Sequence, residues 1–435
     1  MSLITLRYRG PVTGLREAER EALFDRSSPD DDLVRDTVGA IIDLVRREGD
    51  PALRSLAREY DHVKLESLEV PRADCTRALE RMVPELRASM ERAAHNITTV
   101  HAAMRPTAME VESEPGIVIG RRPDPLGRVG VYAPGGKAAY PSSVLMGAIP
   151  ARVAGVGEVI VCSPPGSTGQ PPTAVLAACA IAGVDRVFAV GGAGAVAAMA
   201  YGTASIPRVD RIVGPGNAYV AAAKLMVAGA VAIDSPAGPS ELLVLADDSA
   251  DPAAVARELV AQAEHDEQAC AVALVLGDAL ADRVEASVLA QAAATKRGDI
   301  VRKALEGQGG ILVATSREQA TAFATLYAPE HLLIAMRNPS EITRAVRNAG
   351  TVFEGPSSSA AFGDYMTGAN HVLPTAGLAR AYSGLSTLDF VRWTTWQRIT
   401  PSAAARLAEA VGVFADAEGL DGHARAARAW HGAGQ

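Results

Sequence analysis

The sequence is poor in the features that mark several classes of protein. Aromatic residues make up only 4% of its 435 residues, so a large core has to be built mainly from Ala, Val, Leu and Ile. The net charge of −8 comes without any run of Lys or Arg, which disfavours nucleic acids and anionic membranes as partners. No apolar stretch of about 20 residues is present to span a membrane, and the N-terminus lacks the apolar segment of a signal peptide. We therefore expect a cytoplasmic protein.

Cysteine is scarce as well. The four cysteines lie far apart and form no C-x-x-C pair, which argues against a disulfide framework or a thiolate metal site. We interpret them as small buried side chains in a reducing compartment. They are Cys75, Cys162, Cys179 and Cys270.

The length of the chain and the changes in its hydrophobic pattern indicate several domains. A chain of 435 residues exceeds the size at which one core stops growing. Residues 1–114 show helical spacing of apolar residues, with Pro71 and Pro84 marking breaks, and we interpret them as a helical region that packs on the core. The tail, 376–435, contains a predicted helix over 402–415 and is too short to fold alone, so we expect it to pack on the body or on a second subunit.

Between these ends, short apolar runs alternate with Ala-rich helical stretches, a pattern typical of parallel sheets flanked by helices. We therefore predict an α/β fold with two Rossmann-like domains, 115–237 and 238–375. In the first domain the predicted strands are 129–132, 159–162, 187–190 and 211–213, and the predicted helices are 142–154, 172–182, 193–200 and 218–227. In the second domain the predicted strands are 242–246, 271–276, 311–314, 332–335 and 351–353, with a break expected at Gly309–Gly310.

Three glycine-rich turns follow predicted strands of the first domain, at 132–136, 190–194 and 213–217. Backbone N–H groups at such strand-to-helix turns can bind phosphate or carboxylate oxygens, and glycine permits the close approach. One such turn can be a plain connection. Three in consecutive units favour a ligand at the carboxyl ends of the strands.

Several polar side chains are candidate metal ligands. His265 follows Gln262 by three residues, so both lie on one face of a helix that begins at Asp251 and Pro252. Histidine, carboxylate and amide side chains suit zinc, but no short metal motif applies, so ordinary hydrogen-bonded polar residues remain the alternative. Further candidates are Asp364 and His371, in one turn-rich run, and His423 in the tail. We interpret four other histidines as surface residues: His62, His95, His101 and His431.

Glu330 and His331 are adjacent residues at the start of a predicted strand. Such a pair can supply the acid and base groups of a proton-transfer reaction. Taken alone, a Glu-His pair is also common in solvated loops.

As a set, these motifs resemble histidinol dehydrogenases along nearly the whole chain. The segments that carry the resemblance are GVYAPGG (130–136), AYPSS (139–143), GPGN (214–217), PAGPSE (236–241), QAEH (262–265), APEH (328–331) and NHVLP (370–374).

The resemblance implies an enzyme of histidine biosynthesis that oxidises L-histidinol to L-histidine through a bound aldehyde, using two NAD. It implies a homodimer with shared active sites and one zinc ion per subunit. Glu330 and His331 would be the catalytic acid–base pair. The implied zinc ligands are Gln262, His265 and Asp364, together with His423 from the tail of the partner subunit.

The resemblance also implies contacts with the small molecules. The implied substrate contacts are Ser240, Gln262, His265, His331, Asp364, His371, Glu418 and His423, and the implied NAD contacts are Tyr132, Gly194 and Asn217. The family usually has glutamine where this chain has Gly194, so we expect one cofactor contact to be lost or replaced. The alternatives are a related zinc and NAD dehydrogenase of another small alcohol, such as sulfopropanediol, a binding protein that has kept the fold without catalysis, and a generic α/β scaffold.

Overall fold

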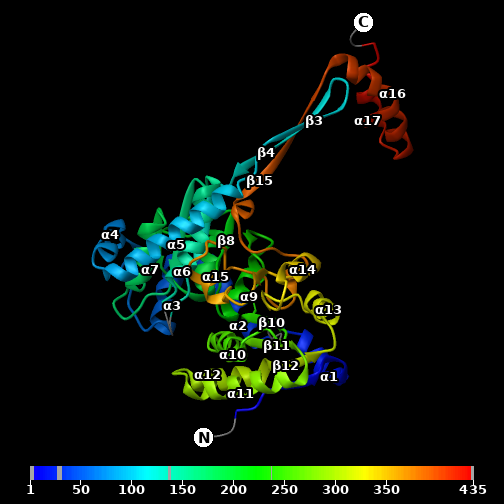
Figure 1. Ribbon diagram of the computed structural model, residues 1–435. Helices are drawn as coiled ribbons and strands as arrows, with labels where there is room; N and C mark the ends of the chain where they lie inside the picture. Colours follow the sequence, from blue (N-terminus) through cyan, green and yellow to red (C-terminus); the bar gives the residue numbers. More distant parts are fainter. Residues whose placement is uncertain (1–3, 27–31, 136–138, 237, 433–435) are drawn as a thin grey trace.

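The computed structural model describes residues 4–26, 32–135, 139–236 and 238–432. Gly136 and Ala237, which belong to predicted motifs, lie outside the described residues. A body of two α/β units carries a long arm, and the arm ends in two helices far from the body (Figure 1).

The first unit is a six-stranded sheet with the order β2-β7-β6-β5-β8-β9, in which only β2 runs antiparallel to its neighbour. All four strands predicted here are confirmed to within one residue at each end. The strands are β2 (Glu69–Val70), β5 (Arg128–Tyr132), β6 (Glu158–Ser163), β7 (Arg186–Ala189), β8 (Arg211–Val213) and β9 (Ala232–Ile233).

The helices of this unit include all four predicted ones and four from the N-terminal region. Pro71 immediately precedes α4 and Pro84 begins α5, because proline is tolerated where the first helical N–H groups lack partners. The helices are α2 (Asp32–Glu48), α3 (Asp50–Tyr60), α4 (Arg72–Glu80), α5 (Pro84–Ala103), α6 (Pro141–Ala154), α7 (Thr173–Ile181), α8 (Gly192–Tyr201) and α9 (Ala218–Val227).

The second unit is a six-stranded, wholly parallel sheet with the order β1-β12-β11-β10-β13-β14. Its five predicted strands are confirmed to within two residues at each end. The edge strand β1 comes from the N-terminal region, for which only helices were predicted. The strands are β1 (Tyr8–Pro11), β10 (Glu241–Ala246), β11 (Cys270–Leu276), β12 (Gly309–Ala314), β13 (His331–Ala335) and β14 (Thr351–Glu354).

Both faces of this second sheet are covered, which explains its continuous apolar strands. Leu242 and Val244 of β10 pack into one buried cluster, and Leu243 and Leu245 pack into another on the opposite face. Burying each such side chain contributes about 1.5–3 kcal/mol. The first face is covered by α10 (Pro252–Ala263), α11 (Asp278–Ala294) and α12 (Gly298–Gln308), and the second by α1 (Glu17–Phe24), α13 (Arg317–Tyr327) and α14 (Pro339–Ala345).

Gly309 and Gly310 do not form a break before a strand, as predicted, but are the first two residues of β12. A Cβ at Gly309 would lie 2.6 Å from the Cα of Leu305, and one at Gly310 would lie 2.9 Å from the Cβ of Tyr8. Glycine is therefore required here for close packing against α12 and β1, not for a turn.

The arm is a three-stranded antiparallel sheet with the order β15-β4-β3, followed by two packed helices. The helix predicted at 402–415 is confirmed as part of α16, whereas the three strands were not predicted. The elements are β3 (Met109–Glu114), β4 (Ile117–Pro125), β15 (Val391–Ile399), α16 (Pro401–Ala417) and α17 (Asp421–Arg428). The remaining short elements are η1 (Val12–Gly14), α15 (Ala360–Tyr365), η2 (Leu378–Arg380) and η3 (Thr387–Phe390).

His101 was wrongly predicted to lie on the surface. Its side chain is only 1% exposed, and the hydroxyl of Thr387 donates to its backbone oxygen at 3.3 Å. The last turns of a polar helix gave no sign that a later segment would cover it. His62, His95 and His431 are exposed, as predicted. The four cysteines are buried and unpaired, as predicted. Among the described helices, none combines the length and apolar character that crossing a membrane requires.

Candidate active site

The Glu330–His331 pair opens β13, next to β10 in the second sheet. Helix α13 ends at Tyr327, and Ala328 takes a left-handed conformation with a φ of 49° before the chain enters the strand. His331 lies opposite Leu242 in the parallel pairing. Both side chains are buried, at 6% and 4% exposed, so the pair does not belong to a solvated loop.

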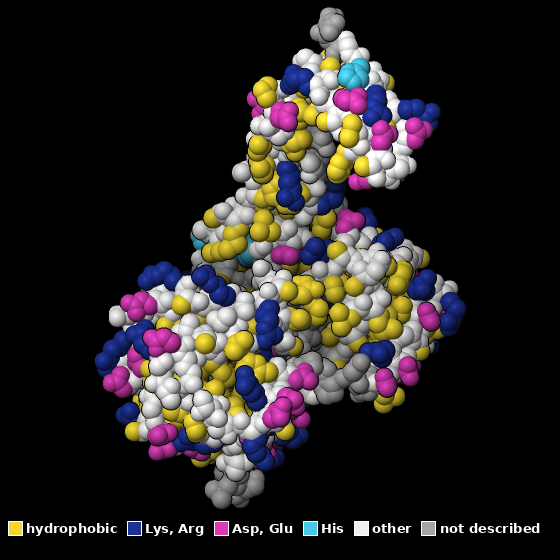
Figure 2. All heavy atoms as spheres, turned by 90° about the vertical axis from the view of Figure 1, so that its right-hand side faces the viewer, with side chains coloured by type: hydrophobic (Ala, Val, Ile, Leu, Met, Phe, Trp, Pro, Cys, Tyr) yellow, Lys and Arg dark blue, Asp and Glu magenta, His cyan; other side chains and the backbone are white. Residues whose placement is uncertain are grey.

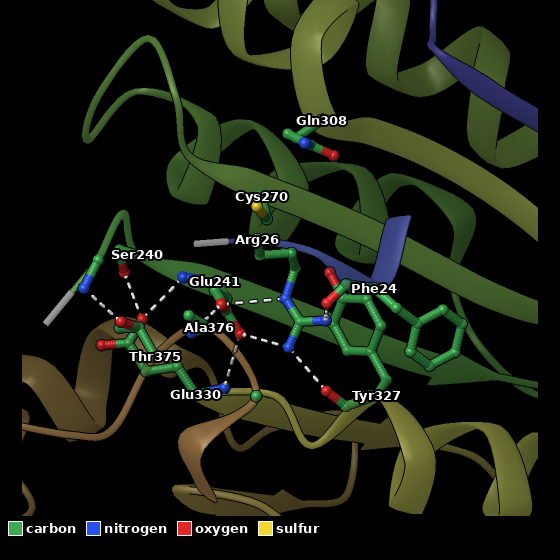
Figure 3. A network of polar contacts seen from close by, with 12 residues as sticks. Phe24, Arg26, Ser240, Glu241, Cys270, Gln308, Tyr327, Glu330, Thr375 and Ala376 are labelled. Carbon is green, nitrogen blue, oxygen red and sulfur yellow. Dashed lines mark hydrogen bonds and ion pairs between the residues drawn. The ribbon is translucent and has the colours of Figure 1, made fainter. Parts of the chain in front are cut away.

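The Glu330 carboxylate is held by two donors at the start of β10. The Ser240 hydroxyl donates to Oε2 of Glu330 at 2.8 Å, and the backbone N–H of Glu241 donates to the same oxygen at 2.7 Å (Figure 3). Hydrogen bonds to an ionised carboxylate are stronger than those between neutral groups. The structure thus brings together Ser240 and Glu330, two of the predicted site residues.

The His331 ring is oriented by the backbone of Glu241. Its Nδ1 lies 2.9 Å from the Glu241 carbonyl oxygen, which can only accept, so we assign the proton of the neutral ring to Nδ1. The other nitrogen, Nε2, has no hydrogen-bond partner among the described residues and lies 3.5 Å from Oδ1 of Asp364. Burial acts to lower the pKa of His331, but the carboxylates of Glu330 and Asp364 outweigh it and raise the pKa well above the ordinary value.

Asp364 and His371 complete this side of the site. Asp364 comes from α15, and Nδ1 of His371 lies 2.8 Å from its backbone oxygen. Burial acts to raise the pKa of Asp364, but the contact with His331 and the charges of His371 and His265 outweigh it and lower the pKa. Burial lowers the pKa of His371. These side chains line a small pocket that Phe353 closes beside the His331 ring.

Gln262 lies in the last turn of α10, whereas His265, predicted to lie on the same helix, follows two residues after its end at Ala263. Gln262 is 5% exposed, and its side-chain nitrogen has no hydrogen-bond partner among the described residues. The His265 backbone N–H donates to the Gln262 carbonyl at 3.2 Å, and its imidazole is exposed. The charge of His265 is among those that lower the pKa of Asp364.

The other predicted zinc ligand and substrate contact are not brought to this site within one chain. Helix α17, which contains His423, and the end of α16, where Glu418 lies, are at the far end of the arm from α15 (Figure 1). Within the described ranges, no group of three or more His, Cys, Asp or Glu side chains is gathered closely enough to hold a metal ion. His265 and Asp364, with the amide of Gln262, are thus the donors that one chain offers.

The predicted NAD contacts lie at the carboxyl ends of strands in the first sheet. Tyr132 ends β5, and its hydroxyl accepts from the backbone N–H of Gly192 at 3.1 Å, at the start of α8. Burial raises the pKa of Tyr132 to about 12. Asn217 follows β8 and caps α9, where its side-chain oxygen accepts from the N–H of Val220 at 3.1 Å.

The turn before Asn217 is fixed by a buried ion pair. Gly214 has a φ of 115°, and a Cβ there would overlap the backbone oxygen of Tyr132, so only glycine fits. Asp234 accepts from the Gly214 N–H at 2.8 Å, and Lys224 donates to the Gly214 carbonyl at 3.0 Å. The two charged side chains also contact each other. The backbone N–H and the backbone carbonyl of Gly214 are therefore both held by this ion pair.

Gly194 lies in a packed position of α8. It is buried, and a Cβ there would lie 3.0 Å from Cδ1 of Leu56 and 3.4 Å from Cδ2 of Leu53, both on α3. A glutamine at this position would have to displace the α3 side chains. This packing gives a physical reason for the residue, while the loss of a cofactor contact stays a prediction.

A cavity of about 350 Å³ lies elsewhere, between β2, β7, α4 and α7. It contains none of the predicted site residues. Glu69 and Asp185, which line it, are held by Arg186 and Arg152. We therefore assign no chemistry to it.

Sequence reasoning missed two residues beside the Glu330–His331 pair, Glu241 and Arg26. Glu241 is a charged residue at the start of an apolar strand, and its burial in that context was a signal that could have been used. Arg26 is 215 residues away in the sequence and shows no local pattern that points to the site.

Comparisons with known proteins show the family of the chain. A family model described as histidinol dehydrogenase matches residues 24–430. The chain is 45% identical over 422 residues to the histidinol dehydrogenase of Methanosarcina mazei, covering 97% of each chain. It is 47% identical over 418 residues to that of Haloarcula marismortui, covering 96% of this chain and 98% of the relative.

The fold agrees as well. The crystal structure of histidinol dehydrogenase from Elizabethkingia anophelis superposes with a TM-score of 0.93 at 34% identity, covering 98% of each chain. Both the length and the architecture are thus shared with these relatives. The chain belongs to the histidinol dehydrogenase family.

Proposed function

We propose that this protein oxidises L-histidinol to L-histidine in histidine biosynthesis, in two successive hydride transfers to NAD through a bound aldehyde. The observation that carries the proposal is the buried Glu330–His331 pair beside Asp364, in a chain that matches the family from residue 24 to residue 430. No observation favours another small alcohol such as sulfopropanediol, and the relatives described above share one name.

In this proposal His331 is the base of the alcohol step. Its Nδ1 is occupied by the Glu241 carbonyl, so Nε2 takes the hydroxyl proton while the hydride leaves for NAD. Because the neighbouring carboxylates raise the pKa of His331, this step requires the ring first to lose the proton on Nε2. Burial keeps water away from the ring, and the Phe353 ring 5.9 Å from it limits its movement. A fixed, dry base lowers the cost of reaching the transition state.

Glu330 is the base of the aldehyde step. The Ser240 hydroxyl and the Glu241 N–H both bind one carboxylate oxygen, which fixes the position of the side chain. A carboxylate held in this way can take a proton from the water that adds to the aldehyde carbonyl. The hydrate then gives its second hydride to NAD and a hydroxyl proton to His331, once the proton taken in the alcohol step has left the ring. One base for the addition of water and one for the two hydride transfers explain why both residues lie together.

Zinc would be held by Gln262, His265 and Asp364 of one subunit and by the partner's His423. The residues fit the ion, because imidazole nitrogens and carboxylate and amide oxygens suit zinc, because Gln262 and His265 lie close together at the end of α10, and because the charge of His265 acts on Asp364. When bound, zinc supplies a fixed positive charge that orients the amino and imidazole nitrogens of the substrate. Ser240 and His371 would contact the same substrate.

The tail 376–435 would belong to the active site of a second subunit. The last two helices carry exposed apolar side chains, and apolar side chains are visible along the arm and at its end (Figure 2). Such a surface is favourable when a partner covers it. In a homodimer that exchanges the arms, the partner's Glu418 and His423 would complete the site. The exposed apolar residues are Val411, Val413, Phe414, Leu420 and Trp430.

NAD would bind at the carboxyl ends of the first sheet, within residues 115–237. Tyr132, Gly194 and Asn217 are the proposed contacts, and 238–375 would carry zinc and the catalytic pair. The helical region 1–114 would pack on both units.

The experiment is a stoichiometry assay with the purified protein. We expect two NADH per L-histidinol consumed, L-histidine as the product, and loss of turnover when a chelator removes the metal. One NADH per substrate, or equal turnover with sulfopropanediol, would contradict the proposal.

A further inference from the structure

Arg26 and Glu241 form a buried ion pair directly behind the catalytic pair. Their residues are 4% and 0% exposed. Nε of Arg26 lies 3.0 Å from Oε1 of Glu241, and Nη2 lies 3.1 Å from Oε2, so the guanidinium binds the carboxylate with two parallel contacts (Figure 3). Bidentate pairing of this kind fixes both groups in one geometry.

Glu241 contacts both catalytic residues with every polar group that it has. Its backbone N–H donates to Glu330, its carbonyl faces Nδ1 of His331, and its carboxylate accepts from the backbone N–H of Glu330 at 3.4 Å. The carboxylate also accepts from the N–H of Ala376 at 2.5 Å. A shift of Glu241 would therefore move the carboxylate and the imidazole together.

Arg26 also binds the end of helix α13, just before the segment that leads to Glu330. Its Nη2 donates to the backbone oxygen of Tyr327 at 2.6 Å, and its guanidinium carbon lies 3.6 Å from the centre of the Tyr327 ring. Tyr327 ends α13, two residues before Pro329 and three before Glu330. Arg26 thus connects the end of α13, just before the strained residue Ala328, to the start of β10.

Stability alone does not require this ion pair. Removing two charges from water costs several kcal/mol per ion, and well-packed apolar residues of similar volume are often at least as stabilising. The Tyr327, Phe24 and Phe323 rings around Arg26 already form an apolar setting. An apolar pair at these positions could not supply the donors and acceptors that hold Glu330 and His331.

We propose that the Arg26–Glu241 ion pair is a positioning device for the catalytic pair, and that Arg26 and Glu241 are positioning residues of the reaction. The inference rests on the proposed roles of Glu330 and His331. Its consequence is that the pair acts on the rate of the chemical steps and leaves metal binding unchanged, because no contact among the described residues joins Arg26 or Glu241 to Gln262, His265 or Asp364.

The test compares Arg26→Met, Glu241→Gln and the double variant, because the double variant leaves no unpaired buried charge and should fold. We expect the double variant to keep its metal content and to keep its KM for L-histidinol within about threefold, while kcat falls about 10- to 100-fold, the range seen for residues that orient a site's direct contacts. Arg26→Lys keeps the positive charge but not the two parallel contacts of the guanidinium. Its kcat should therefore lie between those of Arg26→Met and the wild type.

Arg9→Met is the matched control. Arg9 is an exposed residue of the edge strand β1 and pairs with Glu285 of α11 at 2.7 Å, away from Glu241, Glu330 and His331, so the kcat of the variant should equal that of the wild type. A folded double variant with wild-type kcat, or one whose loss is entirely in KM or metal content, overturns the inference.

Glu330→Gln, assayed in parallel, separates this inference from the proposed function. If Glu330→Gln loses turnover while the double variant does not, only the positioning role fails. If Glu330→Gln itself keeps wild-type turnover, the proposed function fails at that residue.

Discussion

The backbone oxygen of Glu241 lies 2.9 Å from Nδ1 of His331, at the point where β10 and β13 begin side by side. This contact decides which imidazole nitrogen carries the proton and which one is available. It also shows that a peptide group, not a side chain, orients the proposed base. The protonated Nδ1 and the unpartnered Nε2 lead directly to a prediction about His331.

Replacing His331 by asparagine should abolish the alcohol step while the metal stays bound. Asparagine can still donate to the Glu241 carbonyl, but it cannot take a proton, so kcat should fall by about 10²- to 10⁴-fold. The measurement is NADH formation from L-histidinol together with metal content. His95→Asn, on the exposed face of α5, is the control and should behave like the wild type. Normal turnover by His331→Asn would refute the assignment.

Replacing His423 by alanine should lower metal occupancy, although His423 lies far from the other ligands in its own chain. Exposed His431, which pairs with Glu409 on the same helical end of the arm, provides the control variant His431→Ala.

Mixed dimers decide whose site His423 serves. Random mixing of His423→Ala and His331→Asn subunits should restore about a quarter of wild-type turnover, because half of the dimers are mixed and each has one intact site. If His423 served its own subunit, both sites of a mixed dimer would be defective. No recovery on mixing would therefore contradict a shared site.

The parts of the fold that sequence reasoning predicted are those whose burial is uniform. Residues 242–246 and 129–132 are apolar on both faces because helices cover both sides of their sheets, so the strands can be read directly. The strands of the arm are different. β15 has the sequence VRWTTWQRI and is mostly exposed or half-buried, so no apolar pattern marks it.

The site was predictable only in part for a similar reason. Glu330 and His331 are adjacent in sequence, and Gln262 and His265 are three residues apart, so local spacing relates them. The contact of Ser240 with Glu330 spans 90 residues and that of Arg26 with Glu241 spans 215. Such contacts follow from the order of the strands, which no local pattern encodes.

Replacing Gly214 by alanine should weaken NAD binding. An L-residue at a φ of 115° is strained by about 1–3 kcal/mol, and its Cβ would overlap the backbone oxygen of Tyr132. The turn before Asn217 would have to move, so the KM for NAD should rise about tenfold or more, since 1.4 kcal/mol corresponds to a factor of ten.

The matched control for this change is Gly229→Ala. Gly229 has ordinary backbone angles, and a Cβ there would meet nothing within 4 Å. Both variants should keep their metal content and their KM for L-histidinol. An unchanged KM for NAD in Gly214→Ala would argue against this turn as a cofactor contact.

His101 should make the protein less stable in mild acid. Burial lowers its pKa from 6.5 to about 4, so between these values the unfolded chain binds a proton that the folded chain does not. Stability therefore falls as the pH decreases from about 6.5 towards 4, by about 1.4 kcal/mol per pH unit, or about 2 kcal/mol between pH 7 and pH 5. Above pH 7 this contribution does not change.

His101→Leu removes the titrating group, and its unfolding free energy should lack this component of the pH dependence. At pH 7 leucine should cost little, because neither ring nitrogen of His101 has a hydrogen-bond partner among the described residues. The measurement is urea unfolding of the wild type, His101→Leu and the exposed control His95→Leu at pH 7, 6 and 5. If His101→Leu loses as much stability as the wild type over this range, His101 is already protonated in the folded state or another group causes the acid sensitivity.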